Sequence, residues 1–406
     1  MIRSPRPKTM RKRAVTLIAV LIAVLTLAAC GTTEHTTRPD FSESTPRDRT
    51  PSGRTSSARM LDLRWVAPGP SNPEAIVADD RGAVAVGRYG DIVALDRRGQ
   101  EQWTLAVAGD GEQTLRPLAL SPDVAVVPVA PGRVLAVDRN RGEERWSTAI
   151  PDPAAVDVDP DHGSVVAVLT FEGLLFLLDS ADGSARWSTQ LAFGEQAGPV
   201  SVAVRSSRVV VAWGDVGGSH LRVFDADSGR ALWSAVAPLF SGTPAVTADA
   251  VIVSENLEVV GRHVSARILR LDLATGAQVW AHRLDGPFLP QLRVTVGHDI
   301  AAVVNVPGNL SALDLETGSL HWSRQTRRRQ YAAAPTLVGG VIAMPTYGTG
   351  LVAIAAADGS GVRNDAPGPV QTRVTFEGSS AVGRRLYLVG DRSRGEGEVW
   401  MLSASP

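Results

Sequence analysis

One short pattern recurs along the 406 residues of this chain and constrains the fold more than any other feature. An apolar run ends on an aspartate, a turn carries a glycine, and a tryptophan follows eight residues after the aspartate, or seven in the first copy. The six copies begin their turns at Asp96, Asp138, Asp179, Asp225, Asp272 and Asp314 and end at Trp103, Trp146, Trp187, Trp233, Trp280 and Trp322. Their period of 41 to 47 residues indicates a repeat architecture, in which each unit packs on its neighbours.

Two weaker copies and one half-copy complete the series. In residues 349–363, Ala355 replaces the aspartate and Arg363 the tryptophan, and in residues 397–406 Ser403 stands at the aspartate position. The last copy lacks its final strand, while residues 61–68 carry Trp65 with no repeat before them. We therefore predict a closed ring in which the N-terminal strand, at about 61–68, completes the C-terminal unit.

The residues between the copies read as further strands. Short Val/Ile/Ala/Leu-rich runs alternate with Gly, Asp and Pro, and no segment after the N-terminal leader shows a sustained helical period. Each unit then holds four strands, the content of one propeller blade. The prediction is an all-β, eight-bladed propeller of four-stranded antiparallel blades over residues 61–406.

This fold gives each repeated residue a structural task. The aspartate can accept backbone N–H groups within a hairpin turn, and the glycine can adopt a positive φ. The tryptophan begins the outermost strand, where its ring can cover the neighbouring blade and its indole N–H can reach a carbonyl. The repeated residues are therefore expected to be structural rather than functional.

The sequence resembles the PQQ-like, or quinoprotein-like, eight-bladed propellers. Their blade motif A-x-D-x-x-T-G-x-x-x-W is matched best by Ala312 and Asp314, followed by Thr317-Gly318 and Trp322. The resemblance covers about residues 61–406. It implies the fold strongly and the function weakly, because the motif is structural and many functions share the architecture.

The N-terminus reads as a processed leader. Arg3, Arg6, Lys8, Arg11, Lys12 and Arg13 precede an apolar run from Ala14 to Ala29, which is shorter than the roughly 20 residues of a membrane-spanning helix. The run ends in Leu27-Ala28-Ala29-Cys30, which resembles a bacterial lipobox, and Cys30 is the single cysteine of the chain. We expect residues 1–29 to be a lipoprotein signal peptide and Cys30 to carry acyl chains such as palmitate. An ordinary secretory signal with a chance cysteine is the alternative.

The composition of residues 30–60 and the net charge of the chain limit which partners are expected. The segment is rich in Thr, Ser, Arg and Pro and nearly free of aliphatic residues, so we expect a disordered tether. The whole chain carries −1 and residues 1–29 carry +6, which leaves −7 for the processed chain. That balance argues against a nucleic-acid partner. The absence of lysine after Lys12 and the heavy use of Ala, Val, Gly and Arg favour a GC-rich, actinobacterial source.

The resemblance also raises the possibility of a quinone-dependent dehydrogenase. In such enzymes a calcium ion with Glu, Asn and Asp ligands holds the cofactor at the ring axis, often near a vicinal disulfide. This chain has no cysteine pair and no Cys-x-x-Cys-His haem site, and it is shorter than those enzymes and lacks the long insertions that cover their cofactor. We therefore expect no cofactor and no enzymatic activity.

Other candidate sites are weak. Asp157, Asp159 and Asp161 imitate the start of a calcium loop, but His162 and Val168 stand where glycine and glutamate are needed. A polar strand and turn is the expected reading of that segment. The seven histidines show no metal-ligand spacing, so no metal site is predicted.

The most unusual cluster follows Trp322 and consists of Arg324, Arg327, Arg328, Arg329 and Tyr331. On an acidic chain it could bind an anionic partner, or it could be a solvated loop balanced by nearby carboxylates. Its neighbour is the eroded seventh copy, which suggests a functional face, although neutral drift explains the erosion nearly as well. The long hairpin 254–267 is a second candidate surface.

These features together predict a monomeric, extracytoplasmic propeller, anchored to the cell membrane through Cys30. Its layout of lipobox, tether and single ring is similar to the BamB family, whose members bind a membrane-assembly partner through loops on one face. We expect a non-enzymatic scaffold for a protein partner in envelope assembly or sensing. A sensor that captures a sugar or cell-wall fragment at the ring axis stays open, and an axial pocket lined by aromatic residues would favour it.

Overall fold

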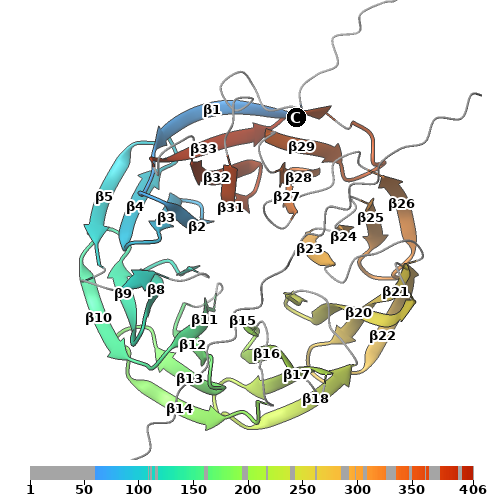
Figure 1. The fold of residues 1–406 in the computed structure, drawn as a ribbon, viewed down its shortest axis with the longest axis horizontal. Helices are drawn as coiled ribbons and strands as arrows, with labels where there is room; N and C mark the ends of the chain where they lie inside the picture. The colour runs from blue at the N-terminus through green and yellow to red at the C-terminus, as the bar shows by residue number, and fades with distance from the viewer. Residues whose placement is uncertain are drawn as a thin grey trace, which may run out of the picture. The chain divides into compact units, whose positions relative to one another are not determined.

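The computed structural model describes residues 60–405, except 108, 110–111, 115–117, 160–162, 194–199, 216–217, 238–242, 261–262, 285–291, 298, 305–308, 326–334, 347–349, 362, 365–374 and 392–395. The described residues form β-strands, turns and bends, in eight antiparallel sheets that are arranged as a ring (Figure 1). This confirms the predicted all-β, eight-bladed propeller. Within these residues no helix is long and apolar enough to cross a membrane.

We number the blades in chain order, and each runs from the innermost to the outermost strand. Blade 1 holds β2 (Pro73–Ala78), β3 (Gly82–Gly87), β4 (Asp91–Asp96) and β5 (Glu101–Ala106). Blade 2 holds β6 (Gln113–Thr114), β7 (Ala119–Leu120), β8 (Val124–Ala130), β9 (Arg133–Asp138) and β10 (Glu144–Ala149). Blade 3 holds β11 (Pro153–Val158), β12 (Val165–Thr170), β13 (Leu174–Asp179) and β14 (Ala185–Gln190). Blade 4 holds β15 (Val200–Arg205), β16 (Arg208–Asp215), β17 (Gly218–Asp225) and β18 (Ala231–Ala237).

The second half of the ring repeats this order. Blade 5 holds β19 (Ala245–Val246), β20 (Ala250–Val260), β21 (His263–Asp272) and β22 (Gln278–Leu284). Blade 6 holds β23 (Arg293–Gly297), β24 (Ile300–Val304), β25 (Asn309–Asp314) and β26 (Leu320–Gln325). Blade 7 holds β27 (Thr336–Val338), β28 (Val341–Thr346), β29 (Gly350–Ala355) and β30 (Arg363–Asn364). Blade 8 holds β31 (Thr375–Val382), β32 (Arg385–Asp391), β33 (Gly397–Ala404) and β1 (Leu61–Pro68).

Two details of the strands bear on the predictions. The innermost position of blade 2 is split between β6 and β7, both of which pair with β8, so this sheet has five strands instead of the expected four. The predicted long hairpin is present as β20 and β21, which extend further than the equivalent strands of the other blades.

The ring closes as predicted. β1 runs antiparallel to β33, with Leu61 opposite Ala404 and Pro68 opposite Glu398, and Figure 1 shows the blue N-terminal strand outside the red C-terminal one. Leu61 is fully buried in a cluster that includes Trp400 and Leu402. The two ends of the domain therefore share one sheet and one core, which joins the ring by hydrogen bonds and apolar burial.

The core lies between neighbouring blades. One cluster joins β8, β9 and β10 of blade 2 to β11, β12 and β13 of blade 3, and comparable clusters join other neighbours. Middle strands such as β3 and β12 are wholly buried, because neighbouring blades cover both of their faces. This explains why those strands read as continuous apolar runs instead of alternating ones.

The repeated residues perform the tasks predicted for them. Each tryptophan indole donates to a carbonyl of the next blade, at 2.7 to 3.0 Å, in the pairs Trp65–Arg97, Trp103–Arg139, Trp146–Ser180, Trp187–Ala226, Trp233–Leu273, Trp280–Leu315 and Trp322–Ala356. The turn glycine of that next blade lies directly under the ring and has a positive φ. Seven of the eight junctions thus use one device, in which an indole covers a turn too tight for any side chain.

The eighth junction, between blades 7 and 8, explains two of the eroded positions. Arg363 pairs with Ala353 where Trp322 pairs with Ala312, so it occupies the tryptophan register. In blade 8, Ser403 pairs with Asp62 of the separate N-terminal strand, so no turn connects the two outer strands and none could receive an indole. Met60 instead lies against Gly361 of blade 7. The erosion at Arg363 and Ser403 thus has a structural reason in the ring seam.

Ala355 is a different case. Its turn keeps the geometry of the other copies, because Gly359 N–H donates to Ala355 O at 3.0 Å and Trp322 still covers Gly359. Asp358 accepts from Ser360 N–H at 2.8 Å and so supplies a carboxylate inside the same turn. The turn therefore tolerates the loss of its first aspartate.

The propeller has two different faces. Turns after the innermost strands and the Asp-x-x-Gly turns lie on one, which we call the Asp-turn face. The connections between blades and the turns between the second and third strands lie on the other, which we call the connection face.

Candidate functional site

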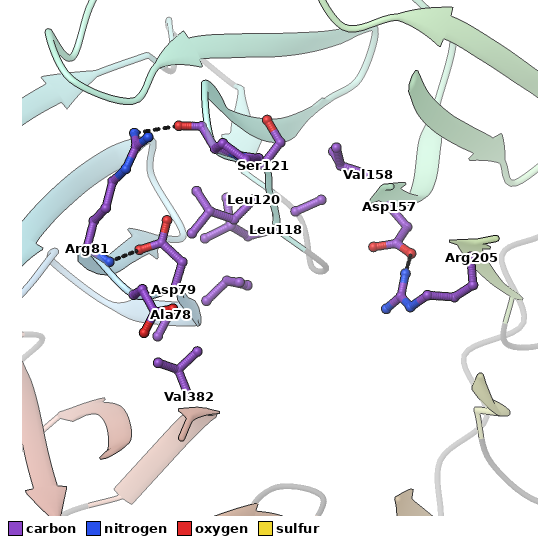
Figure 2. A pocket seen from close by; sticks show the side chains of 14 residues that line it. Ala78, Asp79, Arg81, Leu118, Leu120, Ser121, Asp157, Val158, Arg205 and Val382 are labelled. Atoms are coloured by element: carbon purple, nitrogen blue, oxygen red, sulfur yellow. Dashed lines mark hydrogen bonds and ion pairs between the residues drawn. The ribbon is translucent and has the colours of Figure 1, made fainter. Parts of the chain in front are cut away.

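A pocket of about 590 Å³ lies at the inner ends of several blades. The residues that line it come from the ends of innermost strands and the turns after them: Val77, Ala78, Asp79, Asp80, Arg81, Leu118, Ala119, Leu120, Ser121, Pro122, Asp157, Val158, Arg205 and Val382. Figure 2 shows them around the inner space, with blades 1 to 4 and 8 contributing. Its walls combine aliphatic side chains with five charged ones, and its size is that of ordinary small-molecule sites.

A second pocket, of about 510 Å³, continues along the innermost strands. It is lined by parts of β11, β15, β19 and β23, and it shares Leu118, Asp157 and Arg205 with the first pocket. Because both pockets share these residues, Asp157 and Arg205 lie where the two meet. We call the two together the axial pocket.

Asp157 and Arg205 form the polar centre of the axial pocket. Arg205 Nη1 lies 2.7 Å from Asp157 Oδ2, and the same oxygen accepts from Val204 N–H at 2.9 Å. The pair joins blade 3 to blade 4, because Asp157 belongs to β11 and Arg205 ends β15. Burial raises the pKa of Asp157, while Arg205 and the Val204 N–H act in the opposite direction. Figure 2 shows both side chains at the pocket wall, so a ligand could contact an acceptor and a donor side by side.

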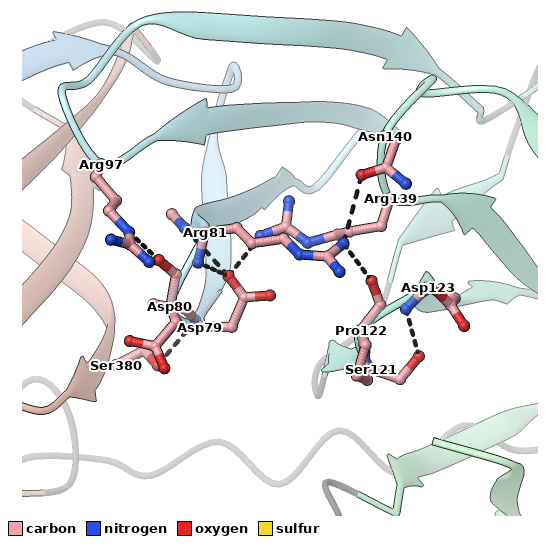
Figure 3. A network of polar contacts seen from close by, with 12 residues as sticks. Asp79, Asp80, Arg81, Arg97, Ser121, Pro122, Asp123, Arg139, Asn140 and Ser380 are labelled. Carbon is pink, nitrogen blue, oxygen red and sulfur yellow. Dashed lines mark hydrogen bonds and ion pairs between the residues drawn. The ribbon is translucent and has the colours of Figure 1, made fainter. Parts of the chain in front are cut away.

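A network of arginines and acids borders the pocket on the Asp-turn face (Figure 3). Asp79 Oδ1 accepts from the backbone N–H groups of Arg81 and Gly82 at 2.8 and 3.1 Å. The same oxygen accepts from Arg139 Nη2 at 3.0 Å, which connects blade 1 to blade 2. The Arg139 side chain is 4% exposed, and its burial lowers the pKa of its guanidinium against the opposing effect of Asp79.

The same network extends to blade 8. Arg97 donates to Asp80 O, and Arg385 of β32 lies 3.0 Å from Asp80 Oδ1. Arg81 Nη1 donates to Pro122 O at 2.6 Å. These contacts hold blades 8, 1 and 2 together at the mouth of the pocket, so we assign them a structural role there.

The structure separates the three aspartates that imitate a calcium loop. Asp157 pairs with Arg205, Asp159 is buried with an exposed fraction of 5%, and Asp161 lies outside the described residues. In the described ranges, no group of three or more His, Cys, Asp or Glu side chains is placed to hold a metal ion.

The described lining does not fit a quinone held by calcium. Asp157 is engaged by Arg205, Asp79 by Arg139, and Asp80 by Arg385, so each acid of the pocket already has a cationic partner. Moreover, among the described residues neither part of the axial pocket is lined by an aromatic side chain. The aromatic residues that would favour capture of a sugar are therefore missing from the described lining.

Most of the predicted arginine cluster lies outside the described residues: Arg327, Arg328, Arg329 and Tyr331. Arg324 is described and lies in β26, not in a loop. Its guanidinium donates to Gly359 O in the turn of blade 7, beside the Trp322 contact. Arg324 thus belongs to a contact between blades, and Cys30 also lies outside the described residues.

Sequence reasoning placed Asp157 in a polar strand and turn, which agrees with its place in β11, but it did not identify Arg205 as its partner. The position of the two residues could have identified them. Asp157 and Arg205 are each a charged residue in the otherwise apolar first strand of a blade. Such a strand lines the ring axis, where charge needs a partner. Which partner it finds depends on the neighbouring blade and could not be read from spacing.

Comparison with known proteins agrees with the geometry. The family model described as outer membrane protein assembly factor BamB matches residues 64–161, 130–288 and 264–405. No curated protein matches the chain in sequence.

Several solved structures share the fold. BamB from Moraxella catarrhalis is 17% identical, with a TM-score of 0.60 over 84% of this chain and 97% of that chain. The quinohemoprotein alcohol dehydrogenase from Comamonas testosteroni is 14% identical, with a TM-score of 0.59 over 87% of this chain and 78% of that one. The computationally designed protein Ika8 is 14% identical, with a TM-score of 0.63 over 82% of this chain and 98% of that chain. These identities indicate a shared fold and no more.

Proposed function

Because the chain belongs to the family of the outer membrane protein assembly factor BamB, we propose that it is a non-enzymatic scaffold that binds a protein partner in the cell envelope. The observation that carries the proposal is the extent of the family match, which runs from residue 64 to residue 405 and so includes all eight blades. We expect the scaffold to act in envelope assembly or sensing, as a monomer.

The rigidity of the ring supports a scaffold role. Seven indole contacts and the network around Asp79 connect neighbouring blades, so loops on either face are held by a firm frame. A rigid frame presents a binding surface without a large ordering cost on association. The polar groups of the axial pocket are engaged with each other, which favours a structural reading of the axis over a catalytic one.

Anchoring is part of the proposal. We propose that residues 1–29 are removed, that Cys30 is lipidated, and that residues 30–60 form a tether to the extracytoplasmic side of the membrane. The test is Cys30→Ser in the full chain, with fractionation and metabolic labelling by palmitate. We expect the variant to lose the label and to leave the membrane fraction, and retention of both in the variant would contradict the proposal.

Partner binding is tested by cross-linking in membranes and recovery of the full chain. Replacement of Arg327, Arg328 and Arg329 by serine asks whether this cluster carries the contact. A matched control replaces the exposed arginines Arg98, Arg141 and Arg145 by serine, which removes the same charge from the Asp-turn face and the blade edge. If the Arg327/Arg328/Arg329 variant loses the partner and the control variant keeps it, the cluster is a binding site. If the two variants recover equal amounts of the partner, the cluster is eliminated as the binding site.

One second candidate is a sensor for a small envelope molecule, which the axial pocket would hold by its polar groups and not by aromatic stacking. The size of the pocket and its Asp157–Arg205 centre are the supporting observation. We would titrate the protein with muramyl dipeptide and with N-acetylglucosamine and follow the Tm, using Asp157→Asn with Arg205→Gln as the control. A shift in the parent protein that disappears in the double variant supports this candidate. A parallel titration with PQQ and calcium, showing neither an absorbance change nor a rise in Tm, would remove the dehydrogenase alternative.

A further inference from the structure

The connection face of blades 1 to 3 carries a row of three short turns. Residues 88–90 connect β3 to β4, residues 131–132 connect β8 to β9, and residues 171–173 connect β12 to β13. They occupy equivalent places in three consecutive blades. We call these three turns, with Asn72, Gln113–Thr114 and Asp152, whose backbones connect them, the tip strip.

Backbone hydrogen bonds connect the tip strip from end to end. On blade 1, Arg88 N–H donates to Asn72 O at 2.9 Å, and Thr114 N–H donates to Arg88 O at 3.0 Å. Gln113 then pairs with Ala130, which brings the series to the turn of blade 2.

The second half of the strip is bonded in the same way. Asp152 N–H donates to Pro131 O at 2.8 Å, and Phe171 N–H donates to Asp152 O at 3.1 Å. The three turns are therefore held in fixed positions relative to one another. A surface held in this way binds with little loss of conformational entropy.

The strip exposes aromatic side chains at its two ends. Tyr89 is 56% exposed and Phe171 is 58% exposed, and in the part of the chain that the structure describes they are the exposed large aromatic residues. Pro131 is exposed at the tip between them. Single exposed apolar residues are ordinary. Two aromatic residues on one rigid row are the arrangement found at interface anchors, where Tyr and Trp are enriched and apolar area is buried on binding.

The charges around these tips are biased toward acid. Arg133 pairs with Glu112 at 2.9 Å, and Arg88 lies 3.9 Å from Glu74, so both arginines face a glutamate. Asp152 and Glu172 lie beside the aromatic tips, and within the described ranges no ion pair with an arginine involves them. Among the described side chains at these tips, the unbalanced charge is thus negative.

We propose that the tip strip is a docking surface for an envelope protein that offers apolar pockets for Tyr89 and Phe171, surrounded by basic side chains. The inference rests on the proposed scaffold function and names where its partner binds. The acidic flanks favour a basic protein surface over a bilayer, because anionic headgroups would repel them.

The experiment uses the full chain in membranes. A photo-cross-linking residue, p-benzoylphenylalanine, replaces Tyr89 or Phe171 in separate variants, and Val279 or Leu320 in the controls. Val279 and Leu320 are 51% and 47% exposed but lie on the outer strands β22 and β26. We expect one and the same protein adduct from both strip positions and none of that adduct from the control positions.

Recovery of that partner is then compared between variants. Tyr89→Ser with Phe171→Ser should lower recovery by about tenfold or more, as expected for two anchor residues. Val279→Ser with Leu320→Ser should leave recovery unchanged, and Glu172→Lys should reduce it. Because all four apolar side chains are exposed, we expect each variant to keep the parent Tm, which excludes misfolding as the cause.

The outcomes separate this inference from the scaffold proposal. If the parent protein recovers a partner and the Tyr89/Phe171 variant recovers as much, the tip strip is refuted and the scaffold stands. If the parent recovers no specific partner, both are refuted. A membrane role is tested with the Cys30→Ser chain and phosphatidylglycerol vesicles. Vesicle binding that depends on Tyr89 and Phe171 would replace the protein partner with a lipid surface.

Discussion

Trp280 of blade 5 covers Gly318 of blade 6 so closely that glycine is the only residue the turn can hold. The indole Nε1 donates to Leu315 O at 3.0 Å, and a Cβ at Gly318 would lie 2.5 Å from the ring. Gly318 also has a φ of 72°, a conformation that disfavours side chains. The same relationship recurs at six other junctions, so the repeat is a device for attaching one blade to the next.

The first prediction concerns this contact. Gly318→Ala combines backbone strain with a clash against Trp280, and we expect a loss of about 2–4 kcal/mol in the free energy of unfolding. Gly340→Ala isolates the strain, because Gly340 has a φ of 80° but open space around it, and should cost about 1 kcal/mol. Gly132→Ala has open space and no positive φ, so it should change little. Urea unfolding of the three variants checks the order, and equal midpoints would contradict the steric role of Trp280.

The second prediction concerns acid stability. Hydrogen bonds from Thr317 lower the pKa of Asp314, and those from Thr275 lower the pKa of Asp272. A lowered carboxyl pKa contributes stability above the unfolded value of about 3.9, and this contribution is lost as the pH falls through the folded value. The Tm should therefore drop steeply below about pH 4.

The control for acid stability is a pair of isosteric changes. Asp272→Asn with Asp314→Asn should make the decline of Tm between pH 5 and pH 3 shallower. Glu101→Gln with Glu144→Gln removes the same charge from exposed positions on outer strands, so it tests whether net charge alone matters. Identical pH profiles for the two double variants would contradict a special role for the turn carboxylates.

The third prediction concerns Asp157, whose pKa is raised where those of the turn aspartates are lowered. Burial raises the pKa of Asp157 and Arg205 opposes that rise, so Arg205→Gln should raise this pKa further. A raised carboxyl pKa favours the fold only while the group is protonated, and this stability is lost as pH rises through the folded value. The Tm deficit of Arg205→Gln should therefore be larger at pH 8 than at pH 5. Adding Asp157→Asn should abolish this pH dependence, and a deficit independent of pH would show that Asp157 is well solvated.

The fourth prediction concerns ring closure. Leu61 is fully buried where β1 meets β33, whereas Val66 on the same strand is 39% exposed. Leu61→Ala should cost about 2–5 kcal/mol, the usual range for a buried leucine. Val66→Ala should cost well under about 1 kcal/mol. Calorimetry of both variants measures this difference, and similar Tm values would mean that the terminal strand contributes little to the ring.

The sequence predicted the architecture because the repeat encodes a local device. Asp314, Gly318 and Trp322 recur at nearly constant spacing, and their spacing alone predicted the turn, the outer strand and the cover on the next blade. The half-copy with Trp65 likewise predicted closure. These features depend on contacts between adjacent units, which repeat with the period of the chain.

The meaning of the weak copies could not be predicted in the same way. Arg363 and Ser403 looked alike as failures of one motif, together with Ala355. The structure separates them, because two lie at the seam where the outer strands are not joined by a turn, while Ala355 lies in a working turn. Only the closed ring shows that blade 8 has no turn between its two outer strands, so the junction of blades 7 and 8 has no turn for an indole to cover.

What the sequence by itself determined is the periodic part: the strands, their turns, the number of blades and the end that completes the ring. What the tertiary structure decided is every contact whose partner lies at no constant spacing. The Asp157–Arg205 pair and the bond between Asp79 and Arg139 are of this kind. A repeat specifies how a blade meets the next one and where each turn lies, whereas the partner of a charge at the axis is decided by the closed ring.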